Sequence, residues 1–127
     1  MVDEAHVLLS SRNELGAEFL AQIQRRSRKY NTGTIIITQQ PTDFAAQNMI
    51  VHGKAIFDNA SYYLVMGLRK QAVEDLSKLI DLNDSEKDSI KYYNQGEALF
   101  ICGNRRMRIT VIVTQEELDS FGSGGGL

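Results

Sequence analysis

The apolar positions of the chain form short groups that alternate between helical and strand-like spacing. The first long group predicts an amphipathic helix over residues 13–29, which ends in a basic turn. Its apolar stripe consists of Leu15, Phe19, Leu20 and Ile23. After Gly33, the β-branched run 34–38 predicts a strand that is buried on both faces of a parallel sheet. Together with a strand that ends near Val2, these elements predict a βαβ unit.

The middle of the chain predicts a mixture of short helices and strands. A short helix begins after Pro41, and two short strands are predicted at 55–57 and 62–66, on either side of turn-forming residues. Beyond Gly67, helical spacing recurs in the set Val73, Leu76, Leu79 and Ile80. Asn83 and Glu86 have the spacing of a capping box, so a second helix is expected to complete a helical hairpin.

The last third of the chain predicts a β-hairpin and a final helical turn. Gly103 and Asn104 form a pair suited to a tight turn between two strands. The expected elements are strands at 98–101 and 108–113 and a helical turn at 116–121.

Length and composition favour one domain. With 127 residues and 43% hydrophobic content, the chain is long enough for one core, which we place in residues 1–122, followed by a flexible Gly-rich tail at 123–127. The net charge of −2 argues against an overall electrostatic grip on nucleic acid or an anionic membrane. No apolar run approaches the length of a membrane span, so we expect a soluble chain. The single cysteine, Cys102, predicts a buried thiol rather than a disulfide or a metal site.

An acidic pair near the start of the chain is the first candidate for chemistry. Asp3 and Glu4 follow an apolar residue, as in a Walker B site, where the Asp holds Mg²⁺ through water and the Glu polarises the attacking water. The alternative is an acidic pair that caps the following helix. The 127 residues contain no Gly-x-x-x-x-Gly-Lys-Ser/Thr phosphate loop. The polar residues Gln39 and Gln40, at the end of the predicted strand 34–38, form a second candidate feature.

Residues 3–6 also read Asp-Glu-Ala-His, the four letters found in superfamily 2 helicases, but the other helicase elements are absent. The chain instead resembles the conjugative-transfer ATPases of type IV secretion systems, of the VirB4 type, which are relatives of the FtsK/HerA-type motors. The segments that carry the resemblance are 2–6, 25–30 and 38–43, and a weaker similarity continues through 53–60 and 95–100. Arg28 and Gln39 have the spacing that this family shows between an arginine and a glutamine before Pro-x-Asp. Ser27 departs from the glycine that is common in the family.

The resemblance implies the C-terminal portion of a RecA-like α/β core, with a mostly parallel sheet flanked by helices and a C-terminal β-hairpin, and without the phosphate-loop strand. It implies ATP and Mg²⁺ as cofactors of the parent enzyme. Asp3 would then be the magnesium residue, Glu4 the catalytic carboxylate, Gln39 the sensor that contacts nucleotide, and Arg28 the arginine finger. Without the phosphate loop, we expect the 127 residues alone to be inactive.

The resemblance also implies partners and a location. The implied partners are identical subunits in a hexameric ring and other secretion-channel subunits, with DNA as a further candidate. The implied location is the cytoplasm, at the inner face of the cell membrane. An unpaired edge at strand 34–38 predicts self-association of the chain. Two alternatives remain open, which are a non-catalytic interaction or oligomerisation module and a remnant of a superfamily 2 DEAH-type helicase.

Two basic clusters and one histidine could serve the structure of the chain rather than catalysis or ligand binding. Arg25 and Arg26 compete with Arg28 for the finger role, and all three could form a solvated helix end that complements the helix dipole. The patch at 105–108 is read as a solvated turn in preference to a DNA or phosphate contact. His6 is expected to support the start of a helix, since no metal-binding spacing accompanies it.

Overall fold

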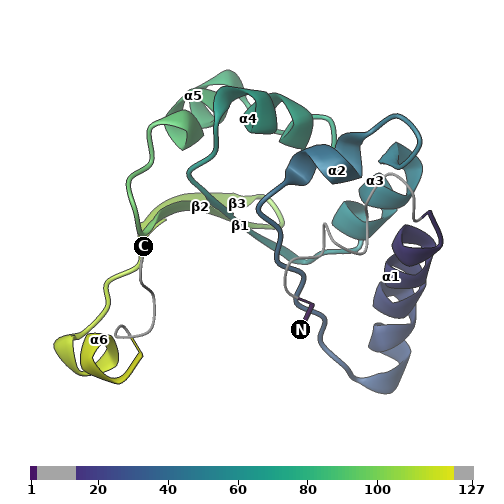
Figure 1. Ribbon diagram of the computed structural model, residues 1–127, viewed down its shortest axis with the longest axis horizontal. Helices are drawn as coiled ribbons and strands as arrows, with labels where there is room; N and C mark the ends of the chain where they lie inside the picture. The colour runs from purple at the N-terminus through teal and green to yellow at the C-terminus, as the bar shows by residue number, and fades with distance from the viewer. Residues whose placement is uncertain (3–13, 122–127) are drawn as a thin grey trace.

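A computed structural model of the protein describes residues 1–2 and 14–121. The predicted βαβ helix is present as α1, Glu14–Ser27, followed by the short 3-10 helix η2, Arg28–Tyr30. An extended segment then leads to α2, Pro41–Ala45, and α3, Ile50–Asp58. Figure 1 shows α1 beside α3, with α2 close to α4.

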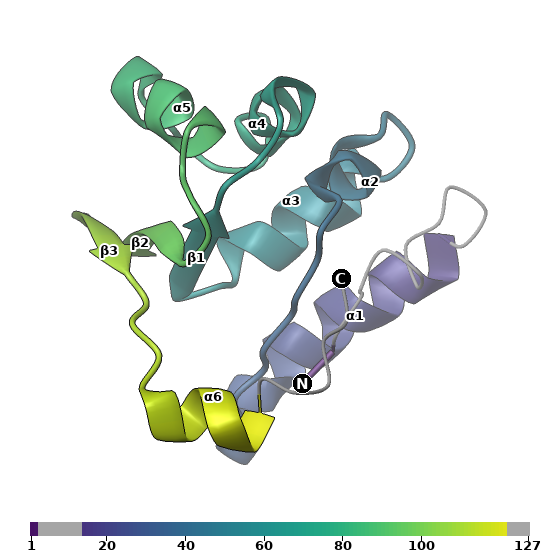
Figure 2. The same ribbon diagram turned by 60° about the vertical axis from the view of Figure 1, so that its left-hand side comes forward.

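The second half of the chain forms a sheet covered by two helices. Its elements are β1 (Tyr62–Met66), α4 (Lys70–Leu76), α5 (Asp84–Lys91), β2 (Glu97–Cys102), β3 (Arg105–Thr110) and α6 (Gln115–Phe121). The strand order is β1-β2-β3, and both pairings are antiparallel. Figure 1 places α4 and α5 over one face of this sheet and shows α6 apart from it, and Figure 2 shows α6 at the end of the segment that leaves β3.

The predicted mostly parallel sheet is therefore wrong for the described residues. They contain one antiparallel sheet of three strands, and their parallel pairing is limited to an isolated bridge between Val2 and Ile36. The predicted hairpin is confirmed, with Gly103 at φ 57°, a left-handed conformation that glycine adopts without steric cost. The fold class that stands is mixed α/β.

Two hydrophobic clusters form the core. The first joins α1, α2 and α3 through Ala17, Leu20, Ala21, Phe44, Ala45, Met49, Ile56 and Leu79. The second lies between the sheet and the α4–α5 pair and contains Val65, Val73, Leu76, Ile80, Leu82, Ile90, Leu99 and Ile101. Phe57 packs against both clusters, since its ring meets Phe44 edge-on at 5.5 Å and stacks on Tyr63 at 6.1 Å.

Two predictions from apolar spacing are corrected by the packing. The predicted strand 55–57 belongs to helix α3. The predicted stripe of α1 is wrong except at Leu20, because its other three members, Leu15, Phe19 and Ile23, are exposed. The buried face carries Ala17, Leu20, Ala21 and Gln24. Small residues on that face let α1 approach α3 closely.

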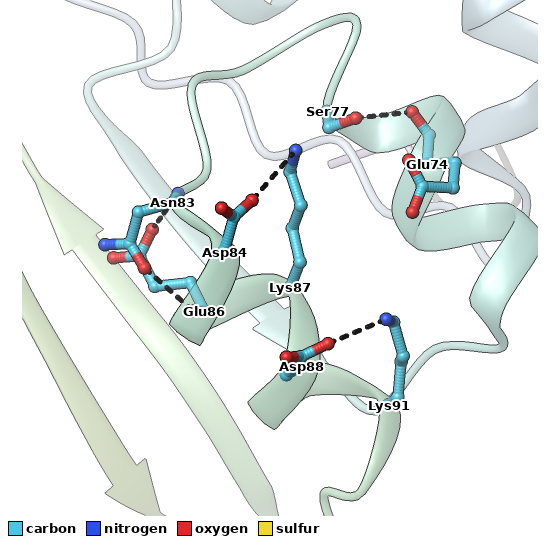
Figure 3. A network of polar contacts seen from close by, with 8 residues as sticks. All are labelled: Glu74, Ser77, Asn83, Asp84, Glu86, Lys87, Asp88 and Lys91. Atoms are coloured by element: carbon cyan, nitrogen blue, oxygen red, sulfur yellow. Dashed lines mark hydrogen bonds and ion pairs between the residues drawn. The ribbon is translucent and has the colours of Figure 1, made fainter.

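The capping box is confirmed. The Asn83 side chain accepts a hydrogen bond from the Glu86 amide at 2.9 Å, and Glu86 accepts one from the Asn83 amide at 3.0 Å (Figure 3). These two bonds satisfy amides that the first turn of α5 leaves unpaired. They fix the point at which the chain turns from α4 into α5.

Gly53 controls how closely α2 and α3 approach. A Cβ atom added at Gly53 would overlap the backbone carbonyl of Phe44. The same addition at Gly33 would meet nothing within 4 Å. Gly53 therefore allows α3 to pack on the helix that directly follows Gln39 and Gln40.

We expect Gly53→Ala to lower the free energy of unfolding by about 1–3 kcal/mol, although alanine normally favours a helix, because the backbone of α2 must move. Gly33→Ala is the matched control and should change stability by less than about 0.5 kcal/mol. Urea unfolding of the two variants measures both values. Equal stability of the two variants would contradict this account of α2–α3 packing.

Candidate functional site

The candidate site is built on the pairing between the first residues of the chain and the segment after α1. The amide of Val2 donates to the Ile35 carbonyl at 2.7 Å, and the amide of Ile37 donates to the Val2 carbonyl at 2.8 Å. These two bonds form the parallel bridge between Val2 and Ile36. The pairing is parallel, as predicted for a βαβ unit with α1 as its helix.

Gln39 lies at this edge with an exposed side chain. The hydroxyl of Thr38 accepts a hydrogen bond from the Gln40 amide at 3.1 Å, which turns the chain at the end of the extended segment. Pro41 then begins α2 as a buried first residue. Gln39 thus stands at the turn between strand and helix, where polar groups can face a ligand.

The predicted carboxylates and histidine at this end of the chain, Asp3, Glu4 and His6, lie outside the described residues. The structure therefore does not test their predicted roles. Among the described residues, no group of three side chains is suited to hold a metal ion.

The backbone of Arg28 lies at the opposite end of the extended segment from Gln39. Helix α1 ends at Ser27, η2 follows, and Asn31 at φ 51° reverses the chain while the Thr32 amide donates to the Ser27 carbonyl at 3.0 Å. Figure 1 shows the chain running from this turn along α1 to the start of α2. At roughly 3.3 Å per residue, the extended path from Gly33 to Gln39 covers about 20 Å. An arginine side chain cannot span that distance.

The other cations of this helix end have structural contacts. Arg25 donates through Nε to the Ala21 carbonyl at 3.3 Å. Arg26 lines a groove of about 270 Å³ together with Ile23, Tyr30 and Thr34. Both arginines also complement the C-terminal dipole of α1, which supports their interpretation as part of a solvated helix end.

The second basic patch is engaged in internal ion pairs. Arg106 contacts Glu86 at 2.7 Å and the Asp81 carbonyl at 2.9 Å. Arg108 contacts Glu97 at 2.6 Å and lies 5.2 Å from the centre of the Tyr93 ring. The Asn94 amide and Arg108 together lower the pKa of Glu97. The prediction of a solvated turn is wrong, because residues 105–108 belong to β3 and two of their arginines are paired within the chain. These ion pairs also argue against a phosphate contact.

A cavity of about 480 Å³ lies away from Gln39, between α3, the α4–α5 connection and the hairpin turn. The cations that line it are Lys54, Lys78 and Arg106. Lys78 and Arg106 are paired with carboxylates of the same chain. The charges around the cavity are therefore largely balanced, and we assign no ligand to it.

The sequence analysis missed Asp75, a carboxylate of α4 that is only 4% exposed. It accepts hydrogen bonds from Lys78 at 2.8 Å and from Gln71 at 3.4 Å, and Thr42 of α2 is a further partner. These contacts, with that of Lys78 the strongest, lower the pKa of Asp75. The sequence shows that Gln71 and Lys78 lie at helical spacing from Asp75, but it does not show the contact with Thr42. Asp75 thus ties α4 to the first turn of the helix that follows Gln39.

No profile of a known protein family matches the chain. The chain is 22% identical to an uncharacterised protein of Bacillus anthracis, over 97% of this chain and 20% of that protein. The solved structure of VirB4 of Thermoanaerobacter pseudethanolicus matches with a TM-score of 0.85 and 32% identity, over 92% of this chain and 31% of that chain. The resemblance inferred from sequence is thus confirmed as a match to part of VirB4. The chain spans about a third of that structure and a fifth of the Bacillus anthracis protein.

None of the helices in the described ranges, 1–2 and 14–121, is long and apolar enough to cross a membrane.

We expect Asp75→Asn to lower the free energy of unfolding at neutral pH by about 2 kcal/mol, because Lys78 and Gln71 lose a charged acceptor that is itself buried. The folded pKa of Asp75 lies below its ordinary value of 3.8, so its stabilisation is present above that pH and is lost as the pH falls through the folded value. The stability difference between the two proteins should therefore narrow in acid below about pH 4. Denaturant unfolding across pH measures it.

The matched control is Asp88→Asn. Asp88 pairs with Lys91 at 2.9 Å with the same spacing along the helix (Figure 3), but its side chain is 73% exposed, compared with 6% for Asp75. We expect the control to cost less than about 0.5 kcal/mol. An equal loss of unfolding free energy in both variants would show that the burial of Asp75 does not strengthen its ion pair.

Proposed function

We propose that the chain is the part of a VirB4-like type IV secretion ATPase that supplies the Walker B carboxylates, the sensor amide and the arginine finger. The match to VirB4 over 92% of the chain at 32% identity carries this proposal. It implies that the phosphate-binding lysine comes from outside these 127 residues, which contain no phosphate loop.

The described backbone supports a shared edge for the predicted catalytic groups. Asp3 follows Val2 directly in the chain, and Val2 is paired with Ile36, three residues before Gln39. In this proposal Asp3 holds Mg²⁺ through water, since carboxylate oxygens are suited to that ion. Glu4 orients and polarises the attacking water, and the Gln39 amide contacts the γ-phosphate or that water. Bound magnesium would supply charge neutralisation on the phosphates.

The position of Arg28 supports a role between subunits. Because its backbone and Gln39 lie at opposite ends of the extended segment, Arg28 cannot reach the edge of its own chain that carries Gln39. It can act as a finger only on the nucleotide of a neighbouring subunit, as in a ring of identical subunits. Arg25 and Arg26 are less suited, since the structure gives Arg25 a backbone contact and Arg26 a place in the groove.

The same proposal places the parent protein in a hexameric ring at the inner face of the cell membrane, with other secretion-channel subunits and DNA as candidate partners. A non-catalytic interaction module is the second candidate function. It is favoured by the exposed apolar side chains on the sheet face opposite α4 and α5, namely Tyr62, Leu64, Met66 and Met107.

The 127-residue chain alone should neither hydrolyse ATP nor bind it tightly. Asp3 and Glu4 are anionic and Gln39 is neutral, so they cannot hold a polyphosphate without the cationic phosphate loop. Isothermal titration with ATP and Mg²⁺ and a phosphate-release assay measure binding and turnover. Magnesium-dependent turnover by the purified chain, abolished by Glu4→Gln, would overturn this prediction.

In the parent enzyme, Glu4→Gln should preserve nucleotide binding and lower kcat by about 100-fold or more, because the amide keeps the shape but cannot act as a base. Arg28→Ala should lower kcat by about 1,000-fold. Glu74→Gln, at an exposed carboxylate of α4, is the matched control and should leave kcat unchanged. An unaltered kcat in Glu4→Gln would exclude the Walker B assignment.

Mixing tests whether Arg28 acts between subunits. Rings assembled from Glu4→Gln and Arg28→Ala subunits should recover part of the activity, because some interfaces pair an intact Glu4 with an intact Arg28 of the neighbour. Rings made only of Glu4→Gln subunits or only of Arg28→Ala subunits serve as the control, since none of their interfaces pairs an intact Glu4 with an intact Arg28. The absence of recovery at every mixing ratio would remove the support for a finger between subunits.

A further inference from the structure

A buried carboxylate holds the first turn of α2, directly after Gln39. Asp75 of α4 is 4% exposed, and the hydroxyl of Thr42 donates a hydrogen bond to its carboxylate. Helices α2 and α4 also pack against each other (Figure 1). Burial of a carboxylate costs solvation free energy, which its hydrogen bonds must offset. The proposed function assigns no role to this group.

The orientation of the Asp75 carboxylate is set within α4. Its Oδ1 atom accepts a hydrogen bond from Lys78 Nζ at 2.8 Å, and its Oδ2 atom accepts one from Gln71 Nε2 at 3.4 Å. Because these donors lie about one turn away on either side, the carboxylate cannot rotate without losing one of them. The helix itself is anchored on the sheet by Val73, which is fully buried in the second core cluster. The acceptor for Thr42 therefore has a fixed position.

Helix α2 depends on its surroundings for the position of its first turn. It is five residues long, well below the length at which a helix is stable by itself. Gln40 stands at its N-cap position but makes no capping hydrogen bond with its side chain. Pro41 and Phe44 are buried and give α2 apolar contacts, which are not directional. The bond from Thr42 to Asp75 adds a directional contact at the first turn.

Little backbone freedom separates Thr42 from Gln39. The ring of Pro41 fixes one of its two backbone angles. Gln40, at φ −128°, is restricted by steric contact with the proline ring that follows it. The amide of Gln40 is also bonded to the hydroxyl of Thr38 at 3.1 Å. A shift of Thr42 is therefore passed on to Gln39 rather than absorbed by the turn between them.

We propose that Asp75 is a positioning residue for Gln39 and acts on it through the hydroxyl of Thr42. This inference rests on the proposed function, in which the Gln39 amide contacts the γ-phosphate or the attacking water. Such a contact stabilises the transition state only if the amide is held in place before the reaction, and a displacement of about 1 Å can lower the rate by about 100-fold. Loss of the Thr42–Asp75 bond should therefore slow hydrolysis without weakening the binding of ATP.

Single-turnover ATP hydrolysis by the parent enzyme, measured over a range of ATP concentrations, separates binding from chemistry. Thr42→Val keeps the size of an exposed side chain but removes its hydroxyl. It should lower the maximal rate by about tenfold and leave the dissociation constant for ATP within about twofold. Thr42→Ser keeps the hydroxyl and should retain the original rate within about twofold. Asp75→Ala, which removes the acceptor, should lower the rate as Thr42→Val does.

A double-mutant cycle distinguishes positioning from a general loosening of the fold. Gln39→Ala alone should lower the rate by about 100-fold. Adding Thr42→Val or Asp75→Ala to it should change the rate by less than about twofold, because the group that they position is already gone. A general loosening of the fold would lower the rate by the same factor with and without Gln39.

Two controls remove similar groups from α5, where their bonds stay within that helix. Asp88→Ala breaks an ion pair with Lys91 that has the same spacing as the pair at Asp75 (Figure 3). Ser89→Ala removes a hydroxyl that donates to the Ser85 carbonyl at 2.8 Å. Both should leave the rate within about twofold of the original enzyme. Circular dichroism checks that each variant is folded at the assay temperature.

Additive losses in the cycle would overturn the inference. So would a Thr42→Val enzyme that keeps the original rate, or one whose defect is confined to ATP affinity. A low rate in Gln39→Ala beside a normal rate in both Thr42→Val and Asp75→Ala would overturn the inference alone and leave the proposed function standing. An unchanged rate in Gln39→Ala would overturn the sensor role itself, and the inference with it.

Discussion

The candidate site depends on two backbone hydrogen bonds, those that join Val2 to the carbonyl of Ile35 and the amide of Ile37. They pair Val2 in the parallel direction with the segment that follows α1. Because the register of a strand pair decides which side chains share a face, a slip of one residue would change the side chains presented near Gln39. The approach of Val2 to the segment that precedes Gln39 therefore rests on main-chain pairing.

Packing behind this edge keeps the pairing in place. Helix α1 covers the segment with small residues, and Ile36 packs against the same cluster as Phe44. Phe57 then links this cluster to the one beneath α4 and α5. Asp75 adds a polar tie between α4 and Thr42, close to the turn after Gln39. The two halves of the protein are thus coupled at the helix that begins where the extended segment ends.

Local chemistry made several elements predictable. The capping box at Asn83 and the Gly103-Asn104 hairpin were predicted because their geometry depends on a few neighbouring residues. The segment Ala55–Phe57 was mistaken for a strand, because a three-residue apolar run has no periodicity that separates a strand from a helix. The segment belongs to a helix that approaches α2 closely at Gly53, a packing that sequence spacing does not reveal.

Two features could not be predicted from the sequence, because both depend on contacts with distant segments. They are the buried face of α1 and the burial of Asp75. Large apolar side chains such as Phe19 suggested the buried stripe, yet the neighbouring helix approaches the face with alanines. The burial of Asp75 could not be predicted, because its contact with Thr42 joins residues more than thirty positions apart in the sequence. Of the candidate site, the pairing of Val2 with Ile36 could be predicted because it follows from βαβ topology. The roles of Asp3, Glu4, Gln39 and Arg28 stay predictions.

The structure of the parent ring with Mg²⁺ and a non-hydrolysable ATP analogue tests the central claim most directly. The account predicts the metal at Asp3, the γ-phosphate within hydrogen-bond reach of Gln39, and Arg28 of the adjacent subunit on the same phosphate. Nucleotide bound away from the edge that carries Gln39, or contacted by Arg28 of its own subunit, would contradict it.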